Sequence, residues 1–177
     1  MKMPEAGGKK WIVVCKEDIS GVCKGRALSK DNARSIAQSF KEQILYCYGA
    51  IPEVVTDNGP SLAGEFAKLA KEFNVKQIKI SPYNSSANRV VERGHFNIRE
   101  GLVKACKGDI SKWPQYLQAA IFADQITTWQ ATGYSPFYLL HGFHPMLLYD
   151  LADTGDKGPN THWVHGENIE ITVNMWL

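Results

Sequence analysis

Short apolar runs alternate with amphipathic stretches along the first 80 residues of the chain. Residues 11–15, 23–28, 53–56 and 75–80 predict strands, because each is a short run with β-branched or alternating apolar residues next to turn formers. Residues 32–48 and 62–73 predict helices, since apolar residues recur there at helical spacing. We expect Ser29 or Asp31 to cap the first helix and Gly49 to end it.

The second half of the sequence predicts helices separated by loops. Residues 89–107, 113–129 and 136–141 have helical patterns, and residues 81–88 form a loop of turn-forming residues. This order predicts an α/β fold, a mixed sheet flanked by helices, over residues 1–151. Residues 152–177 are rich in Gly, Asp and Asn and predict an irregular tail, with a stray strand near residues 169–173.

The composition is that of one soluble globular domain: 177 residues, 44% of them hydrophobic and 21% charged. The net charge is only +2, but its distribution is uneven. Residues 60–107 hold nine Lys and Arg against four Asp and Glu, whereas residues 143–177 hold one Lys against five acids. A basic stretch of this kind favours a polyanion partner, and the alternative is a solvated helix face.

The cysteines and the hydropathy of the chain indicate its cellular location. The four cysteines are scattered with no C-x-x-C pair, which indicates reduced thiols and argues against a structural zinc site. No apolar run reaches membrane-spanning length, and no apolar signal core follows the N-terminus. These features predict a protein of the nucleus or cytoplasm that is not secreted and has no membrane partner.

Two carboxylates stand out as candidate metal ligands. Asp57 follows the apolar strand 53–56 and begins the turn Asp57-Asn58-Gly59-Pro60, while Glu92 lies near the start of the predicted helix 89–107. Mg²⁺ prefers oxygen ligands, and two such ions can activate the attacking and leaving oxygens of a phosphodiester. The alternative is that Asp57 only makes a turn and Glu92 only lies on a solvated surface.

Asp57 and Glu92 belong to a set of short motifs that follow one another along the chain. The set comprises T-D-N-G at 56–59, I-S-P-Y at 80–83, A-N at 87–88, V-E-R-G-H at 91–95, W-P at 113–114, T-G-Y-S-P-F at 132–137, L-H-G at 140–142 and D-L at 150–151. Together they resemble the integrase core of gypsy-type long-terminal-repeat retrotransposons, which are kin of retroviral integrases.

The resemblance implies a ribonuclease-H-like fold and a metal-dependent DNA chemistry. The implied reactions are processing of a DNA 3′ end and attack of that 3′-hydroxyl on a target phosphodiester, with Mg²⁺ or Mn²⁺ as cofactor. The family's catalytic and metal-binding set is two Asp and one Glu. Asp57 matches the second Asp, and Glu92 matches the Glu.

The family's first Asp has no counterpart in this sequence. It lies on the opening strand just before a stretch that Met1-Lys2-Met3-Pro4 resembles, so we expect a core that lacks its extreme N-terminus and has a truncated first strand. Metal binding should therefore be weakened. Asp18 matches an acid that is not a ligand in the family. An active nuclease would need Asp18 or Glu17 as a substitute.

Basic, aromatic and amide residues around Glu92 are candidates for nucleic-acid contact. Arg89, Arg93, Lys104 and Lys107 fall on roughly one stripe of the predicted helix, and Arg99 lies on the Glu92 face. Asn88 and Tyr83 belong to the preceding loop, where Tyr83 either stacks on a base or anchors the loop. The expected partner is DNA, with RNA as the other polyanion, and the intact family member is expected to be a homo-oligomer.

The leading hypothesis is an integrase core whose catalysis is impaired by the missing Asp. The alternative is a domesticated module that keeps the fold and binds nucleic acid or protein without catalysis. In either case we expect the shortened opening strand to leave its neighbours in the sheet without hydrogen-bond partners.

Overall fold

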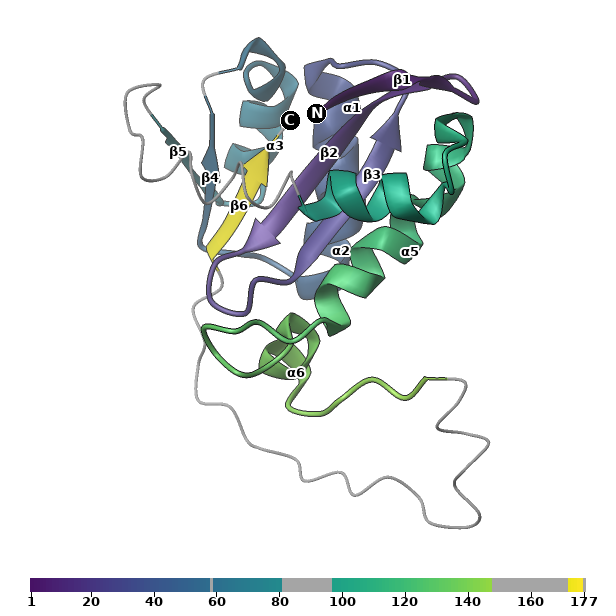
Figure 1. Cartoon of the computed structure of the whole chain (residues 1–177). Helices are drawn as coiled ribbons and strands as arrows, with labels where there is room; N and C mark the ends of the chain where they lie inside the picture. Colours follow the sequence, from purple (N-terminus) through teal and green to yellow (C-terminus); the bar gives the residue numbers. More distant parts are fainter. Residues whose placement is uncertain (58, 81–96, 148–171, 177) are drawn as a thin grey trace.

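A mixed six-stranded sheet forms the centre of the molecule (Figure 1). The computed structural model describes residues 1–57, 59–80, 97–147 and 172–176. The strands are β1 (Lys2–Ala6), β2 (Lys9–Glu17), β3 (Cys23–Leu28), β4 (Glu53–Thr56), β5 (Lys76–Lys79) and β6 (Thr172–Trp176). β1, β2 and β3 pair antiparallel, whereas β4 is parallel to both β5 and β6.

The turn between β2 and β3 depends on a buried carboxylate and a glycine. Glu17 is buried and accepts hydrogen bonds from the backbone N–H groups of Ile19 and Ser20. Gly21 has φ +73°, and a Cβ there would lie 1.8 Å from the ring of Trp129. Only glycine suits this position, because the backbone is left-handed and the indole ring packs directly on it.

The helical segment after β3 contains a widened turn that the sequence pattern does not predict. It consists of α1 (Ala33–Phe40), the π-helical η1 (Lys41–Leu45) and α2 (Tyr46–Tyr48). The cap of α1 is Asn32, which accepts from the Ser35 N–H at 2.9 Å, so the prediction of Ser29 or Asp31 is wrong. Gly49 ends the segment as predicted, with φ +79°.

The second predicted helix is split. A short 3₁₀ turn, η2 (Pro60–Leu62), comes first, and α3 (Glu65–Glu72) follows after Gly64, whose φ is +58°.

The described helices of the second half are the helical residues 97–105, the 3₁₀ turn η3 (Ile110–Lys112), α5 (Trp113–Ile126) and α6 (Pro136–His141). Of these, the stretch 97–105 and α5 cover the other face of the sheet, and α6 lies beyond the end of β2 and β3 (Figure 1). α5 ends three residues before the predicted Trp129, because Thr127 is extended (φ −76°, ψ 126°). None of the helices within the described residues is long and apolar enough to cross a membrane.

The sheet separates two hydrophobic cores. On one face, Val13 and Val54 pack with Phe40 of α1 and Phe66 of α3. On the other face, Ile12 and Val14 pack with residues of the helical stretch 97–105 and α5, among them Ile98, Leu102 and Trp113. Alternation along the strands produces this division. The predicted core position of Trp113 is confirmed, and its Nε1 donates to the Pro4 carbonyl at 2.8 Å.

The opening strand is short, but its neighbours keep their partners. β6 lies between the second half of β2 and β4, antiparallel to the first and parallel to the second. The prediction that a truncated first strand leaves its neighbours unpaired is therefore wrong. β6 overlaps the stray strand predicted near residues 169–173 and extends three residues beyond it, whereas residues 152–171 of the predicted irregular tail lie outside the described residues.

Candidate functional site

Asp57 lies at the carboxyl end of β4, as the sequence predicts. Its Oδ1 accepts a hydrogen bond from the Gly59 N–H at 2.8 Å, so the carboxylate shapes its own turn. A Cβ at residue 59 would lie 2.8 Å from the same oxygen, which explains the glycine there. The carboxyl ends of parallel strands are a common place for ligands in α/β sheets, and Asp57 is half-buried at that edge.

A hydrogen-bond network fixes the strand end that carries Asp57. Thr56 is fully buried, and its Oγ1 accepts from Gln77 Nε2 at 3.0 Å. The same Nε2 donates to the Leu62 carbonyl at 3.0 Å, and the Ile80 N–H donates to the Thr56 carbonyl at 2.8 Å. β4, β5 and the turn before α3 are thereby joined directly beside Asp57, so its backbone is held in place without a metal.

The alternation of side chains along β4 decides on which face of the sheet Asp57 lies. Val54 belongs to the core beneath α1 and α3, and Thr56 reaches Gln77 and the segment near Leu62. The next residue, Asp57, therefore comes on the side of the helical stretch 97–105. That stretch is the described continuation of the helix predicted to carry Glu92.

A partly buried amino group interacts electrostatically with Asp57. The α-amino group of Met1 donates to the Ile12 carbonyl at 2.8 Å. Burial lowers the pKa of this amino group to about 6, while the nearby carboxylates of Asp31 and Asp57 act in the opposite direction and raise it. Asp31 and Asp57 thus both act on the Met1 amino group, which the sequence pattern does not reveal because it indicates Asp31 only as a possible helix cap.

Asp31 is half-buried, and one of its carboxylate oxygens is shielded from solvent. Its Oδ1 is the one buried side-chain oxygen of the described residues without a hydrogen-bond partner. Even so, the described residues contain no group of three His, Cys, Asp or Glu side chains placed to hold a metal ion.

The two acids that the sequence offers as substitutes lie in the wrong place. Glu17 pairs through β6 with the region of Val54, three residues before Asp57, and its carboxylate is committed to the β2–β3 turn. Asp18 follows Glu17 and lies still farther along that turn. Neither residue can replace a carboxylate beside Asp57.

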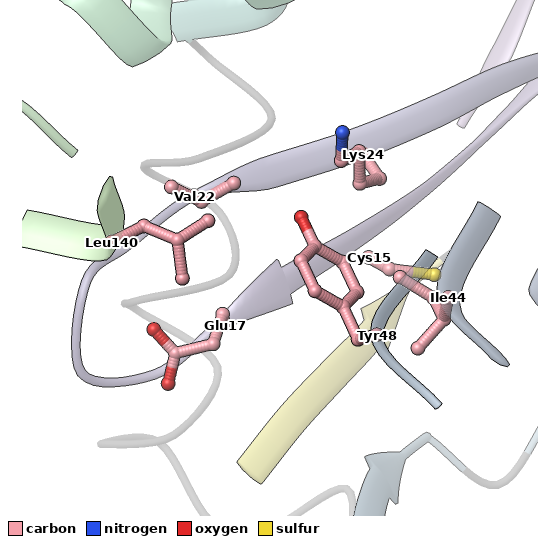
Figure 2. A pocket seen from close by; sticks show the side chains of 7 residues that line it. All are labelled: Cys15, Glu17, Val22, Lys24, Ile44, Tyr48 and Leu140. Atoms are coloured by element: carbon pink, nitrogen blue, oxygen red, sulfur yellow. The ribbon is translucent and has the colours of Figure 1, made fainter. Parts of the chain in front are cut away.

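A small apolar pocket near Glu17 offers packing rather than chemistry. Figure 2 shows the side chains that line it: Cys15 and Glu17 from β2, Val22 from the turn, Lys24 from β3, Ile44 from η1, Tyr48 from α2, and Leu140 from α6. Burial raises the pKa of the Cys15 thiol, and burial raises the pKa of Tyr48 to about 12. Both groups are therefore protonated at neutral pH, and the pocket holds no ready nucleophile.

Three of the predicted nucleic-acid residues are described, and all three are exposed. In the helical stretch 97–105, Ile98 and Leu102 face the core, whereas Arg99 and Lys104 face solvent. Lys104 lies 3.7 Å from Glu100 across one helical turn, and Lys107 follows the helix end with φ +48°. The exposed positions suit phosphate contact, and the pairing of Lys104 with Glu100 reduces its net positive field.

The other predicted site residues lie outside the described residues. They are the candidate catalytic and metal ligand Glu92 and the candidate nucleic-acid residues Tyr83, Asn88, Arg89 and Arg93. Their predicted roles stay predictions.

The sequence is similar to parts of retroviral and retrotransposon proteins. No family model matches the chain. It is 27% identical over 158 residues to the Gag-Pol polyprotein of Koala retrovirus, a match covering 88% of the chain and 9% of that protein. It is 25% identical over 133 residues to Gypsy retrotransposon integrase-like protein 1 of Pongo abelii, covering 75% of the chain and 24% of that protein.

The solved structures that this fold resembles are catalytic core domains of retroviral integrases. The catalytic core domain of BIV integrase superposes with a TM-score of 0.61 at 24% identity, covering 72% of this chain and 83% of that one. Sequence and structure together support an integrase core domain. The HTLV-2 integrase catalytic core domain in complex with magnesium also superposes with a TM-score of 0.61, at 19% identity, covering 72% of this chain and 82% of that one.

The matches confirm the predicted ribonuclease-H-like fold of this chain. The chain spans 9% of the viral polyprotein and 24% of the gypsy-type relative that it matches. It is therefore similar to one domain of much longer proteins.

Proposed function

We propose that this integrase core acts on DNA in an integration process, with Asp57 as a ligand for Mg²⁺ or Mn²⁺. The observation that carries the proposal is the fixed placement of Asp57 at the carboxyl end of a parallel strand in an integrase-like sheet. The sequence similarity to retroviral and gypsy-type proteins supports a DNA role, and the magnesium in the HTLV-2 core supports the metal.

The described residues fit a divalent cation only in part. Asp57 supplies one hard oxygen ligand, and the predicted partner Glu92 lies outside the described residues. The neighbouring strand position beside Asp57 belongs to Trp176, a residue type whose side chain contains no oxygen. We therefore propose weak binding of a single cation and strand transfer near background, since a two-metal site needs a further carboxylate.

Phosphate contacts account for DNA binding in this proposal. Arg99 and Lys104 are exposed on the helical stretch 97–105, Lys107 is exposed just after it, and the stretch from residue 60 to residue 107 is basic. Contacts of lysine and arginine with the backbone position DNA without reading its sequence. Binding in a nuclear or cytoplasmic location, as a homo-oligomer, belongs to the same proposal, and RNA binding stays an untested prediction.

Fluorescence anisotropy with labelled duplex DNA tests the central statement. We expect binding that is independent of sequence and falls steeply with salt. Absence of binding at low salt would contradict a DNA role.

A joining assay with a labelled 3′-end oligonucleotide, plasmid DNA and Mg²⁺ or Mn²⁺ tests the proposal that strand transfer is near background. Robust joining that Asp57→Asn abolishes would contradict the proposed impairment.

The non-catalytic alternative makes a different prediction about the metal. A domesticated binding module has no use for a cation at Asp57, so Asp57→Asn should leave Mn²⁺ affinity unchanged. In our proposal the same substitution removes the measurable Mn²⁺ binding, because Asp57 is the carboxylate ligand among the described residues. Titration with Mn²⁺ followed by electron paramagnetic resonance separates the two.

A further inference from the structure

A slot in the middle of the sheet takes one extended strand. We call it the strand slot; it lies between residues 14–17 of β2 and residues 53–56 of β4. β1 does not reach it, because the Cα partners of β1 on β2 are Trp11 and Lys9 and the pairing continues only to Met1 opposite Ile12. Val14, Cys15, Val54 and Thr56 along its edges are all buried.

An empty strand slot would be costly. Its edges are backbone N–H and C=O groups of two buried strands, and each such group left without a partner costs about 1–3 kcal/mol. β6 supplies these partners: Val14 to Glu17 of β2 pair with Trp176 to Val173, and Glu53 to Thr56 of β4 pair with Thr172 to Met175. The occupant runs in the same direction as β1, since both are antiparallel to β2.

The register brings β6 into line with the start of the chain. Met1 exchanges two backbone hydrogen bonds with Ile12, each 2.8 Å long, and Trp176 pairs with Val14. Only the position opposite Val13 separates the two strands, and Figure 1 shows the end of β6 next to the start of β1. β6 therefore follows the path that a strand leading into Met1 would take.

The same register decides which residue stands beside Asp57. Met175 is the partner of Thr56, so one step farther along the two parallel strands Trp176 is the neighbour of Asp57. A carboxylate that shared a cation with Asp57 from the adjacent strand would have to come from this position.

We propose that β6 is an autoinhibitory strand that fills the strand slot within its own chain and keeps a carboxylate-bearing strand from the position beside Asp57. The inhibitory part rests on the proposed function, whereas the occupancy does not. The 24 residues between Leu147 and Thr172 can extend to roughly 80 Å, which exceeds the diameter of a domain of this size, so the connection within one chain needs no strain.

Cross-linking of the full chain tests the occupancy. Cys15 and Met175 are Cα partners across β2 and β6, so Met175→Cys should form a disulfide with Cys15 under mild oxidation. The exposed Cys47 is replaced by Ser in all variants. The expected product is a cross-linked monomer on a non-reducing gel, with a disulfide-linked peptide pair joining positions 15 and 175 by mass spectrometry.

Asn174→Cys is the matched control, because its partner on β2 is Lys16 and no thiol lies opposite. We expect no cross-link from this variant. Cross-linked dimers from Met175→Cys would assign the strand slot to a second copy and overturn the proposal, as would the absence of any cross-link specific to position 175.

A second readout tests the position beside Asp57 without any DNA chemistry. Trp176→Asp should raise the affinity for Mn²⁺ at least roughly tenfold, as a first-sphere ligand should matter no less than the outer-sphere partners that change affinity 10–100-fold. Asn174→Asp, on the same strand but beside Val55, should not change it. Addition of Asp57→Asn to Trp176→Asp should remove the gain. No gain from Trp176→Asp, or an equal gain from Asn174→Asp, would overturn the proposed register, whatever the outcome of the DNA assays.

Discussion

Gln77 Nε2 donates to Thr56 Oγ1 at 3.0 Å and joins the two parallel strands next to Asp57. Because Thr56 is fully buried, its hydroxyl oxygen has no water to replace this donor. The same amide nitrogen also reaches the Leu62 carbonyl, so one side chain holds the strand end and the following turn together. The rigidity of the Asp57 backbone follows from this arrangement.

Removing the Gln77 amide should destabilise the fold. We expect Gln77→Ala to lower the free energy of unfolding by about 1–3 kcal/mol, because it leaves a buried acceptor unsatisfied. Urea unfolding followed by circular dichroism measures the change. Lys79→Ala, at an exposed position of the same strand, should change stability by less than about 0.5 kcal/mol. Equal effects of the two substitutions would contradict the role of Gln77.

A methyl group at Gly21 should be poorly tolerated. We expect Gly21→Ala to destabilise the protein by roughly 1–3 kcal/mol, since the new Cβ meets the Trp129 ring and the backbone is left-handed. In a Trp129→Ala background the collision is absent, and only the smaller backbone penalty should remain. Thermal unfolding of the four variants in this cycle measures the coupling, and additive effects would contradict the packing of Trp129 on Gly21.

The exposed lysines at the end of the helical stretch 97–105 should control the salt dependence of DNA binding. We expect Lys104→Glu and Lys107→Glu each to reduce the slope of log affinity against log salt by about one, because each substitution leaves one DNA phosphate without its lysine. Anisotropy titrations over a range of salt concentrations give these slopes. Lys71→Glu changes charge equally on α3, beyond the opposite face of the sheet, and should leave the slope nearly unchanged if binding is localised.

A strand added before Met1 should compete with β6. If five residues preceded Met1, they would run along β2 from Val13 to Glu17. An Asp two residues before Met1 would then pair with Val14, which is the residue that Trp176 pairs with in β6. We expect such an extended chain to bind Mn²⁺ and to join DNA ends more strongly when residues 172–177 are deleted. The same extension with Asn in place of Asp is the control, and joining that does not depend on this Asp would contradict the prediction.

Local sequence signals predict much of the fold correctly. The strands at residues 23–28 and 53–56 and the helix at residues 136–141 coincide with β3, β4 and α6. Asp57 is recognisable because a turn directly follows a short apolar strand, and the motif set around it indicates the integrase core. These features depend on neighbours in sequence, where side-chain periodicity and turn chemistry are sufficient.

Other features depend on contacts between distant parts of the chain. The π-helical turn at Lys41–Leu45 has no local marker, and Asp31 and Asp57 act together on the Met1 amino group only in the folded chain. Glu17 is a candidate acid by sequence position, but the turn that it organises lies three register steps from Asp57.

The motifs along the chain are enough to establish the fold family, the order of most elements and the place of Asp57. The occupant of the strand slot is decided only in the folded molecule. The sequence indicates only a stray strand near residues 169–173 and not its place in the sheet, because a strand acquires its partners through backbone hydrogen bonds that any extended segment can offer. Two buried strands with unpaired edges select β6, and that selection places Trp176, rather than a carboxylate, beside Asp57.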